Sequence, residues 1–312
     1  MNKLAFVFPG QGAQAVGMGK EFFDNYDVAK RLFKEADEAL GYSIMKMCFE
    51  GPEEELRLTA NTQPAIFTVS VIAAEILKEN GIVPDIAGGH SLGEYSALVT
   101  AGVMNFQDAV ALVHKRGAYM QEAVPVGEGG MAAVLGLDRD KIVEICSAVS
   151  AGAVVQAVNF NCPGQTVIAG SAKGVEMAVE KLGEAGAKCI PLPVSAPFHS
   201  TLMAPAAEKL AVELDKVEIR DAKIPVVANV SGEIVTEAAA IKASLVKQAA
   251  SPVKWEDCVA TMVGFGADIF VEAGPGKTLC GFNKRINRKL KSVNVENMRS
   301  LQKTLDDLKG VR

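Results

Sequence analysis

The chain has 312 residues, which is longer than most single domains, so we expect one large domain with an insertion, or two domains. A net charge of −5 argues against general nucleic-acid binding, which requires a basic surface. No apolar stretch approaches the roughly 20 residues of a membrane span, and the run before Pro9 is too short for a signal peptide. The six cysteines lack metal-binding spacing and fit a reducing compartment. We therefore expect a cytoplasmic protein without membrane contact.

The first part of the chain alternates apolar strands with helices. An apolar run at 4–8, ended by Pro9 and Gly10, predicts a buried parallel strand. The glycines after it match a dinucleotide-binding pattern, but no clear helix begins there and no acidic residue ends a second strand, so a loop that lines another pocket is favoured. Further predicted elements are helices at 21–40, 63–80, 94–101 and 106–123, the last capped by Asn105, and a short strand entry at 83–87.

The middle of the chain predicts a small separate unit. A glycine-rich stretch at 125–130 reads as a linker. The elements expected after it are a strand at 131–137, a helix from an Asp138 cap to 149, strands at 154–159 and 166–169, a helix from a Ser171 cap to 184, and a strand at 187–194. The order β-α-β-β-α-β is that of the ferredoxin-like arrangement. We therefore predict an inserted ferredoxin-like domain at 127–195, within an α/β domain formed by 1–126 and 196–312.

The α/β pattern resumes after this insertion. We expect helices near 202–214, 241–249 and 255–264, and strands at 226–230 and 269–272. The stretch Gly274–Thr278 looks like a phosphate-binding loop, but Val271 occupies the position of its required first glycine. Nucleotide hydrolysis is therefore not favoured.

A Gly-x-Ser-x-Gly pentapeptide at residues 89–93 lies between an apolar stretch and a predicted helix. In a nucleophile elbow, such glycines let the backbone close and expose the serine at the start of a helix, where backbone N–H groups can stabilise an oxyanion. The alternative is a glycine-rich turn that happens to contain a serine. The context favours Ser91 as a nucleophile.

An activated serine needs a nearby base. Of the three histidines, His90 adjoins the nucleophile and should point elsewhere, and His114 lies within a predicted helix, where a structural role is the better interpretation. His199 lies in a proline-punctuated loop where the small domain returns to the large one. We favour His199 as general base over a structural histidine.

The acidic member of a hydrolase triad is missing. No acidic residue between Ser91 and His199 ends an obvious core strand, which weakens a simple esterase interpretation. Arg116 lies one turn before Met120 on the next helix and could hold a carboxylate in a bidentate pair. A solvated arginine is an equally valid interpretation of the sequence alone.

Together these stretches resemble the malonyl-CoA:acyl carrier protein transacylases over essentially the whole chain. The matching stretches are Phe8–Gly12, Thr62–Ala65, Gly89–Tyr95, Arg116–Gly117, Ala196–Ser200 and Glu272–Gly276.

The resemblance implies an α/β-hydrolase-like large domain, with Ser91 as nucleophile and His199 as base. It further implies that a backbone carbonyl near Gln248 orients the imidazole, which explains the missing acid, and that the backbone amides of Gln11 and Leu92 form the oxyanion hole. Arg116 would bind the malonyl carboxylate, with Met120 and Phe198 in the substrate site. Phe198 before the histidine is the pattern that polyketide acyltransferases associate with malonyl.

The implied activity transfers malonyl from malonyl-CoA to the phosphopantetheine thiol of acyl carrier protein through a malonyl-serine, in support of fatty acid synthesis and without a metal or redox cofactor. We expect a monomer. Carrier proteins of this type are acidic, and a basic cluster on a predicted helix could steer docking or simply be solvated: Lys284, Arg285, Arg288, Lys289 and Lys291. The alternatives are a serine thioesterase or esterase, and a stand-alone polyketide acyltransferase.

Overall fold

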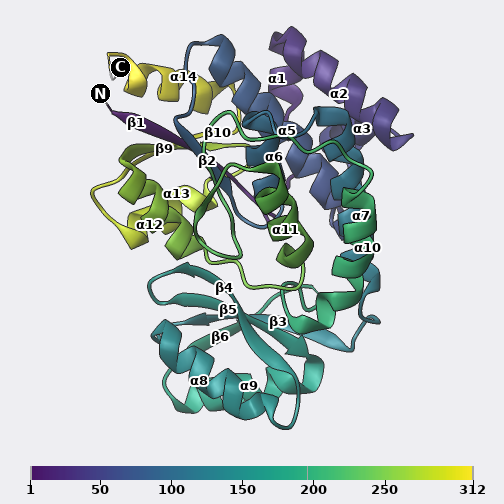
Figure 1. Ribbon diagram of the computed structural model, residues 1–312, viewed down its shortest axis with the longest axis vertical. Coiled ribbons are helices and arrows are strands. Elements are labelled where there is room, and N and C mark those ends of the chain that lie inside the picture. The colour runs from purple at the N-terminus through teal and green to yellow at the C-terminus, as the bar shows by residue number, and fades with distance from the viewer. Residues whose placement is uncertain (1, 195, 311–312) are drawn as a thin grey trace.

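The computed structural model describes residues 2–194 and 196–310, which form a mixed α/β structure with two sheets. Figure 1 shows the smaller sheet, with its two helices, below the larger unit. The strands of the larger sheet are β1 (Lys3–Phe8), β2 (Ile86–Gly89), β7 (Val226–Val227), β8 (Ile234–Val235), β9 (Ala267–Ala273) and β10 (Lys291–Val295). Those of the smaller sheet are β3 (Gly129–Leu135), β4 (Val155–Cys162), β5 (Gln165–Ser171) and β6 (Lys188–Pro191).

The larger sheet has the strand order β10-β9-β1-β2-β7-β8 and is parallel except for the pair β7–β8. Strand β1 lies between β2 and β9, and its side chains alternate between two apolar layers. Leu4, Phe6 and Phe8 pack into one layer, and Ala5 and Val7 into the other. A strand buried on both faces has to be apolar at every position, which is why residues 4–8 form an unbroken apolar run.

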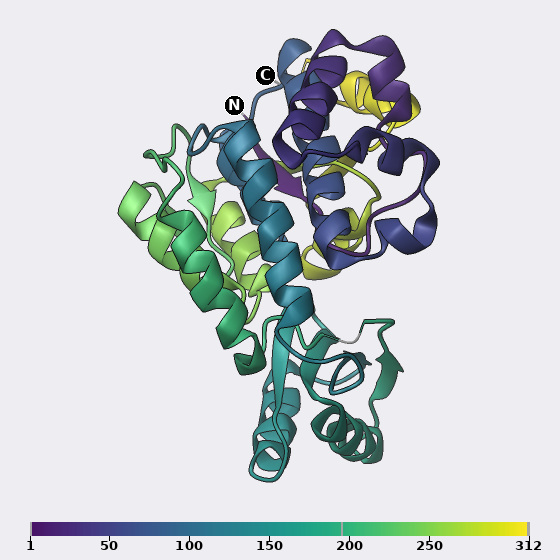
Figure 2. The same ribbon diagram turned by 90° about the vertical axis from the view of Figure 1, so that its right-hand side faces the viewer.

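Helices cover both faces of this sheet. Helices α12 and α13 contribute to the layer with Ala5 and Val7, and most of the others pack on the opposite face (Figures 1 and 2). The helices of this unit are α1 (Lys20–Asn25), α2 (Asp27–Leu40), α3 (Ile44–Glu50), α4 (Glu53–Leu56), α5 (Thr59–Glu79), α6 (Gly93–Thr100), α7 (Phe106–Glu122), the 3-10 turn η1 (Thr201–Met203), α10 (Ala204–Leu214), α11 (Ala238–Gln248), α12 (Trp255–Phe265), α13 (Thr278–Ile286) and α14 (Met298–Leu308). Among the described residues, no helix combines the length and apolarity needed to cross a membrane.

The smaller unit is antiparallel, with the strand order β4-β5-β3-β6. Its helices are α8 (Arg139–Ser150) and α9 (Ala172–Glu184), which pack on one face of the sheet. The other face contributes Met131, Val158 and Val167 to an apolar cluster that also contains Phe198 and Met203 of the larger unit. This second face therefore borders the region around His199.

Backbone hydrogen bonds, an ion pair and side-chain hydrogen bonds connect the smaller unit to the larger one. Strand β4 exchanges backbone hydrogen bonds with Val253, at 2.9 Å from the Phe160 amide and 2.8 Å to the Val158 carbonyl. Arg139 forms a bidentate ion pair with Asp257, 2.9 Å at its shortest, and Arg285 donates a 2.8 Å hydrogen bond to Gln165. Val253, which pairs with β4 of the smaller unit, lies five residues after Gln248 in the sequence.

Most predicted elements are present, with shifted ends. The helix expected at 21–40 is two helices broken at Tyr26, whose backbone is extended. The strand expected at 83–87 begins only at Ile86, and the one expected at 226–230 has two residues, because the chain turns at Asn229. Residue 195, the predicted end of the insertion, lies outside the described residues.

The sequence analysis predicted N-cap residues for three helices, and two of these caps are confirmed by a side-chain hydrogen bond. The Ser171 side chain accepts a 3.1 Å hydrogen bond from the Gly174 amide, so this cap is confirmed. Asp138 precedes α8 as expected, but its side chain makes no capping hydrogen bond. Asn105 caps α7 as predicted, by accepting a 2.8 Å hydrogen bond from the Asp108 amide.

Candidate active site

Ser91 lies in the tight turn between β2 and α6. Its backbone has φ 53°, a left-handed conformation that residues with a side chain rarely adopt. The glycines on either side permit this turn, because a Cβ on Gly89 would lie 2.0 Å from the Gly93 carbonyl carbon and one on Gly93 would lie 2.1 Å from the Phe8 carbonyl oxygen. The turn presents the Ser91 hydroxyl at the start of α6, at the carboxyl end of the parallel strands.

His199 faces this hydroxyl directly. Its Nε2 lies 2.7 Å from Ser91 Oγ, and its Nδ1 lies 3.0 Å from the backbone carbonyl of Gln248. A carbonyl can only accept a hydrogen bond, so it fixes the neutral imidazole with the proton on Nδ1 and leaves Nε2 free to accept one from Ser91. Burial, and then the charge of Arg116, lower the pKa of His199 to about 3. The imidazole is therefore neutral near neutral pH, with Nε2 unprotonated.

Arg116 lies next to both residues, with only 1% of its surface exposed. Its Nη2 donates to Ser91 Oγ at 3.1 Å and to Gln248 Oε1 at 3.0 Å, and its Nη1 donates to Gln63 Oε1 at 2.7 Å. Its Nε is buried and has no hydrogen-bond partner among the described residues. Burial lowers the pKa of this guanidinium below its usual range. Of the two interpretations left open for Arg116, the solvated arginine is thus ruled out.

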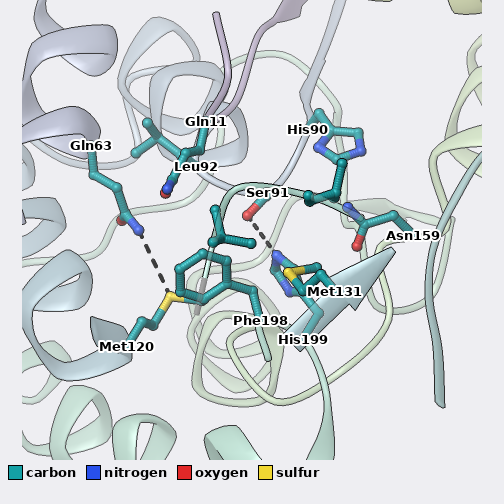
Figure 3. Close-up of a pocket in the computed structure, with 12 residues that line it drawn as sticks. Gln11, Gln63, His90, Ser91, Leu92, Met120, Met131, Asn159, Phe198 and His199 are labelled. Atoms are coloured by element: carbon teal, nitrogen blue, oxygen red, sulfur yellow. Dashed lines mark hydrogen bonds between the residues drawn. The ribbon is translucent and has the colours of Figure 1, made fainter. Parts of the chain in front are cut away.

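A cavity of about 120 Å³ opens over the serine and the histidine. In the view of Figure 3, Gln11 and Leu92 lie toward one side of Ser91 and His199 toward the other. The lining residues are Gln11, Gln63, His90, Ser91, Leu92, Met120, Met131, Asn159, Leu192, Val194, Phe198 and His199. No hydrogen bond from the backbone amide of Gln11 or Leu92 occurs within the described ranges. The cavity thus combines a polar end at Ser91 with an apolar wall.

The other two histidines have structural partners. His90 Nε2 lies 2.8 Å from Asn161 Oδ1 on β4, so its ring points away from the serine hydroxyl, as expected. His114 Nδ1 lies 2.9 Å from the Ala60 carbonyl. Neither ring contacts the Ser91 hydroxyl.

The basic cluster does not lie on one helix, and this prediction was wrong. Lys284 and Arg285 occupy the last turn of α13, which ends at Ile286. Arg288 and Lys289 lie in the following turn, and Lys291 begins β10. The sequence spacing concealed the break, because charged residues carry little information about where a helix ends. All five side chains are exposed, and none forms an ion pair within the described part of the chain.

Three residues around the site were missed by the sequence analysis. Gln63 pairs with Arg116, while Glu94 and Asn229 form a buried network behind the elbow. Gln63 and Glu94 lie within stretches that already carried the resemblance, so their buried polar side chains could have been singled out. Asn229 offered only one signal, a polar residue within the apolar stretch 226–230 that was expected to form a strand.

Comparison with known proteins assigns the class. The family model described as an acyl transferase domain matches residues 5–309 of the chain. The chain is 51% identical to the malonyl CoA-acyl carrier protein transacylase of Bacillus subtilis (strain 168), over 99% of this chain and 98% of the relative. It is 49% identical to that of Escherichia coli (strain K12), over 92% and 93%.

Solved structures that resemble this chain belong to the same class of protein as the sequence relatives. The malonyl CoA-acyl carrier protein transacylase from Clostridium perfringens superimposes with a TM-score of 0.97 at 46% identity, covering 99% of this chain and 98% of that one. A malonyl-transacylase in complex with its type II PKS acyl-carrier protein gives 0.95 at 44%, covering 98% and 100%. The chain therefore belongs to the malonyl CoA-acyl carrier protein transacylase family of acyl transferases.

Proposed function

We propose that this chain transfers a malonyl group from malonyl-CoA to the phosphopantetheine thiol of an acyl carrier protein, in support of fatty acid synthesis. The observation that carries the proposal is the Ser91 Oγ–His199 Nε2 distance of 2.7 Å, with Nδ1 held by a backbone carbonyl. This pairing supports a nucleophile and a general base that need no acidic partner. The names of the relatives supply the two substrates.

The chemistry proceeds in two half-reactions. Nε2 of His199 accepts the Ser91 proton as Oγ attacks the thioester carbonyl, and the amides of Gln11 and Leu92 stabilise the oxyanion. The tetrahedral intermediate collapses, the coenzyme A sulfur leaves and takes the proton from the imidazolium, and a malonyl ester remains on Ser91. The carrier-protein thiol then loses its proton to His199 and attacks this ester. The bond from the malonyl carbonyl to Ser91 Oγ breaks as His199 returns the proton to Oγ, which leaves the malonyl group on the carrier-protein sulfur and the serine free. Side chains and amides supply every proton transfer and every charge contact, so the proposed reaction uses no metal or redox cofactor.

Arg116 supports selectivity for malonyl. A guanidinium has five N–H groups, and three of them donate to Gln63, Gln248 and Ser91. The Nε hydrogen and one Nη1 hydrogen therefore have no acceptor among the residues that the structure describes. Arg116 does not line the cavity directly. The malonyl carboxylate would bind the Nη1–Nη2 edge of the guanidinium as Gln63 and Ser91 release their contacts with it, with Met120 and Phe198 against its carbon chain.

The architecture fits the same proposal at a finer level. The parallel sheet with the serine elbow supports an α/β-hydrolase-like domain at 1–126 and 196–312, and the β-α-β-β-α-β order supports a ferredoxin-like insertion at 127–195. The cysteines are all free thiols, which fits a reducing cytoplasm. The expected monomer remains a prediction.

Intact-mass measurement tests the proposal. After brief exposure to malonyl-CoA, wild type should gain one malonyl unit and Ser91→Ala none, and holo acyl carrier protein should remove the unit faster than water does. Rapid release by water alone would favour the thioesterase or esterase alternative. A second carrier protein, from a polyketide system, separates the polyketide alternative, which the structural neighbour with a type II PKS carrier protein makes worth testing.

We also propose that the exposed basic cluster docks the acidic carrier protein. The double variant Arg288→Glu, Lys289→Glu should slow transfer to the carrier protein and leave loading from malonyl-CoA unchanged. The matched control Lys173→Glu, Lys181→Glu reverses two exposed charges on α9. An equal effect of the two double variants on transfer would contradict this docking site.

A further inference from the structure

The backbone at Ser91 has to be held in place. A non-glycine residue at φ 53° is strained, and such a conformation persists only when its surroundings over-determine it. The glycines at 89 and 93 allow the turn to form, but they contribute no side chain that could fix it. Some other group must therefore restrain the peptide units next to Ser91.

Asn229 makes the two contacts that do this. It lies two residues beyond β7, the strand that pairs with β2, and is fully buried. Its Oδ1 accepts a 2.7 Å hydrogen bond from the Ser91 amide, and its Nδ2 donates a 2.7 Å hydrogen bond to the Gly89 carbonyl. One planar amide thus bridges the peptide groups on both sides of the turn, with donor and acceptor both used.

Glu94 holds Asn229 in turn. Its Oε2 accepts a 3.0 Å hydrogen bond from the Asn229 backbone amide and a 2.7 Å hydrogen bond from Gln248 Nε2. The same Nε2 donates to the Ser91 carbonyl at 3.0 Å. Gln248 also supplies the carbonyl that orients His199. A single buried carboxylate oxygen therefore joins the segment that holds the serine to the segment that orients the histidine.

We propose that Asn229, whose backbone amide is hydrogen-bonded to Glu94, is a positioning residue for the acyl-transfer reaction. Asn229 keeps Ser91 Oγ within hydrogen-bonding distance of His199 Nε2. This inference rests on the proposed function for the identity of the reaction, although the bracing of Ser91 can be measured without it. Neither Asn229 nor Glu94 lines the cavity, so neither contributes directly to substrate binding.

The test compares Asn229→Ala with a matched control, Asn283→Ala. Asn283 is equally buried, and its side-chain amide has no partner among the residues described, so its loss removes a buried amide without touching the elbow. The readouts are kcat and KM for malonyl loading, the rate of Ser91 sulfonylation by phenylmethylsulfonyl fluoride, and the thermal midpoint. A displacement of about 1 Å costs about 100-fold in rate, so Asn229→Ala should lower kcat and sulfonylation by about that factor, with KM little changed.

A second pair of variants covers the case in which Asn229→Ala does not fold. Glu94→Gln retains an oxygen for both N–H donors and should keep most of the sulfonylation rate, whereas Glu94→Ala removes the acceptor and should lose it. Equal rates for these two variants would overturn the inference.

The outcomes separate the two proposals. If folded Asn229→Ala is sulfonylated at the wild-type rate, Asn229 does not position Ser91 and the inference is overturned. It is also overturned if Asn283→Ala, with the same thermal midpoint, loses as much of the sulfonylation rate as Asn229→Ala does. If wild type is sulfonylated but never malonylated, the proposed function fails, while the Asn229 comparison still decides the brace.

Discussion

The selectivity of the site can be tested at Arg116, because this guanidinium contacts Ser91 and the described residues that line the cavity include no lysine or arginine. Arg116→Ala removes two charge-assisted hydrogen bonds to a malonyl carboxylate. Each contributes about 1.5 to 3 kcal/mol, or about 3 to 6 kcal/mol together. Since about 1.4 kcal/mol corresponds to a factor of ten, kcat/KM for malonyl-CoA should fall by about 10² to 10⁴. Arg116→Lys retains the charge without the fork and should fall between Ala and wild type.

Acetyl-CoA provides the contrast. An acetyl group leaves the guanidinium unpaired, so loading with acetyl should not fall in Arg116→Ala and should rise relative to malonyl. The assay is competitive loading from an equimolar mixture of the two thioesters, read as the ratio of the two acyl-enzyme masses. Sulfonylation of Ser91 in the same variants controls for the loss of the 3.1 Å contact from Arg116 to Oγ. An equal loss of malonyl and acetyl loading would refute the selectivity argument.

Three further predictions concern stability. Burial raises the pKa of Glu94 from 4.5 to about 7. The contribution of Glu94 to the free energy of unfolding is therefore complete below about pH 4.5 and is lost as the pH rises through 7. Relative to Glu94→Gln, wild type should lose about 2 to 3 kcal/mol of unfolding free energy between pH 5 and 8, measured by urea titration. A double-mutant cycle on the half-exposed pair Arg139–Asp257 should give a coupling of about 0.5 to 1 kcal/mol, and zero would show that this ion pair does not fasten the two units. Ser171→Ala should destabilise by about 1 kcal/mol while Asp138→Ala changes little, because only Ser171 makes a capping hydrogen bond; similar losses would contradict this assignment.

The sequence pattern was sufficient for the order of the elements that it predicted and for the pair Ser91 and His199 at the cavity. Ser91 and His199 carried strong signals, because a strained elbow requires glycines at fixed spacing and a neutral base at this position is normally a histidine. The β-α-β-β-α-β order followed from hydrophobic period and turn residues, since both depend on local sequence alone.

The buried network could not be predicted in the same way. Gln63, Glu94 and Asn229 come from three distant segments, and each is a polar residue whose burial depends on partners that only the fold brings together. The burial of Arg116 was open for the same reason. Helix ends near residues 26 and 286 were misplaced because a single extended residue interrupts a periodic pattern without changing it.

The position of β1 in the larger sheet has a consequence for how the chain is made. This strand pairs on one side with β2 and on the other with β9, so Leu4 contacts Ile269 across more than four-fifths of the chain. At about 5 to 20 residues per second, a ribosome needs on the order of 10 to 50 s to reach β9 after it has made β1. Throughout that interval one edge of an apolar strand has no partner. Nascent chains that stop before Ala267 should therefore depend on a chaperone to stay dispersed, and synthesis of β9 should end that dependence.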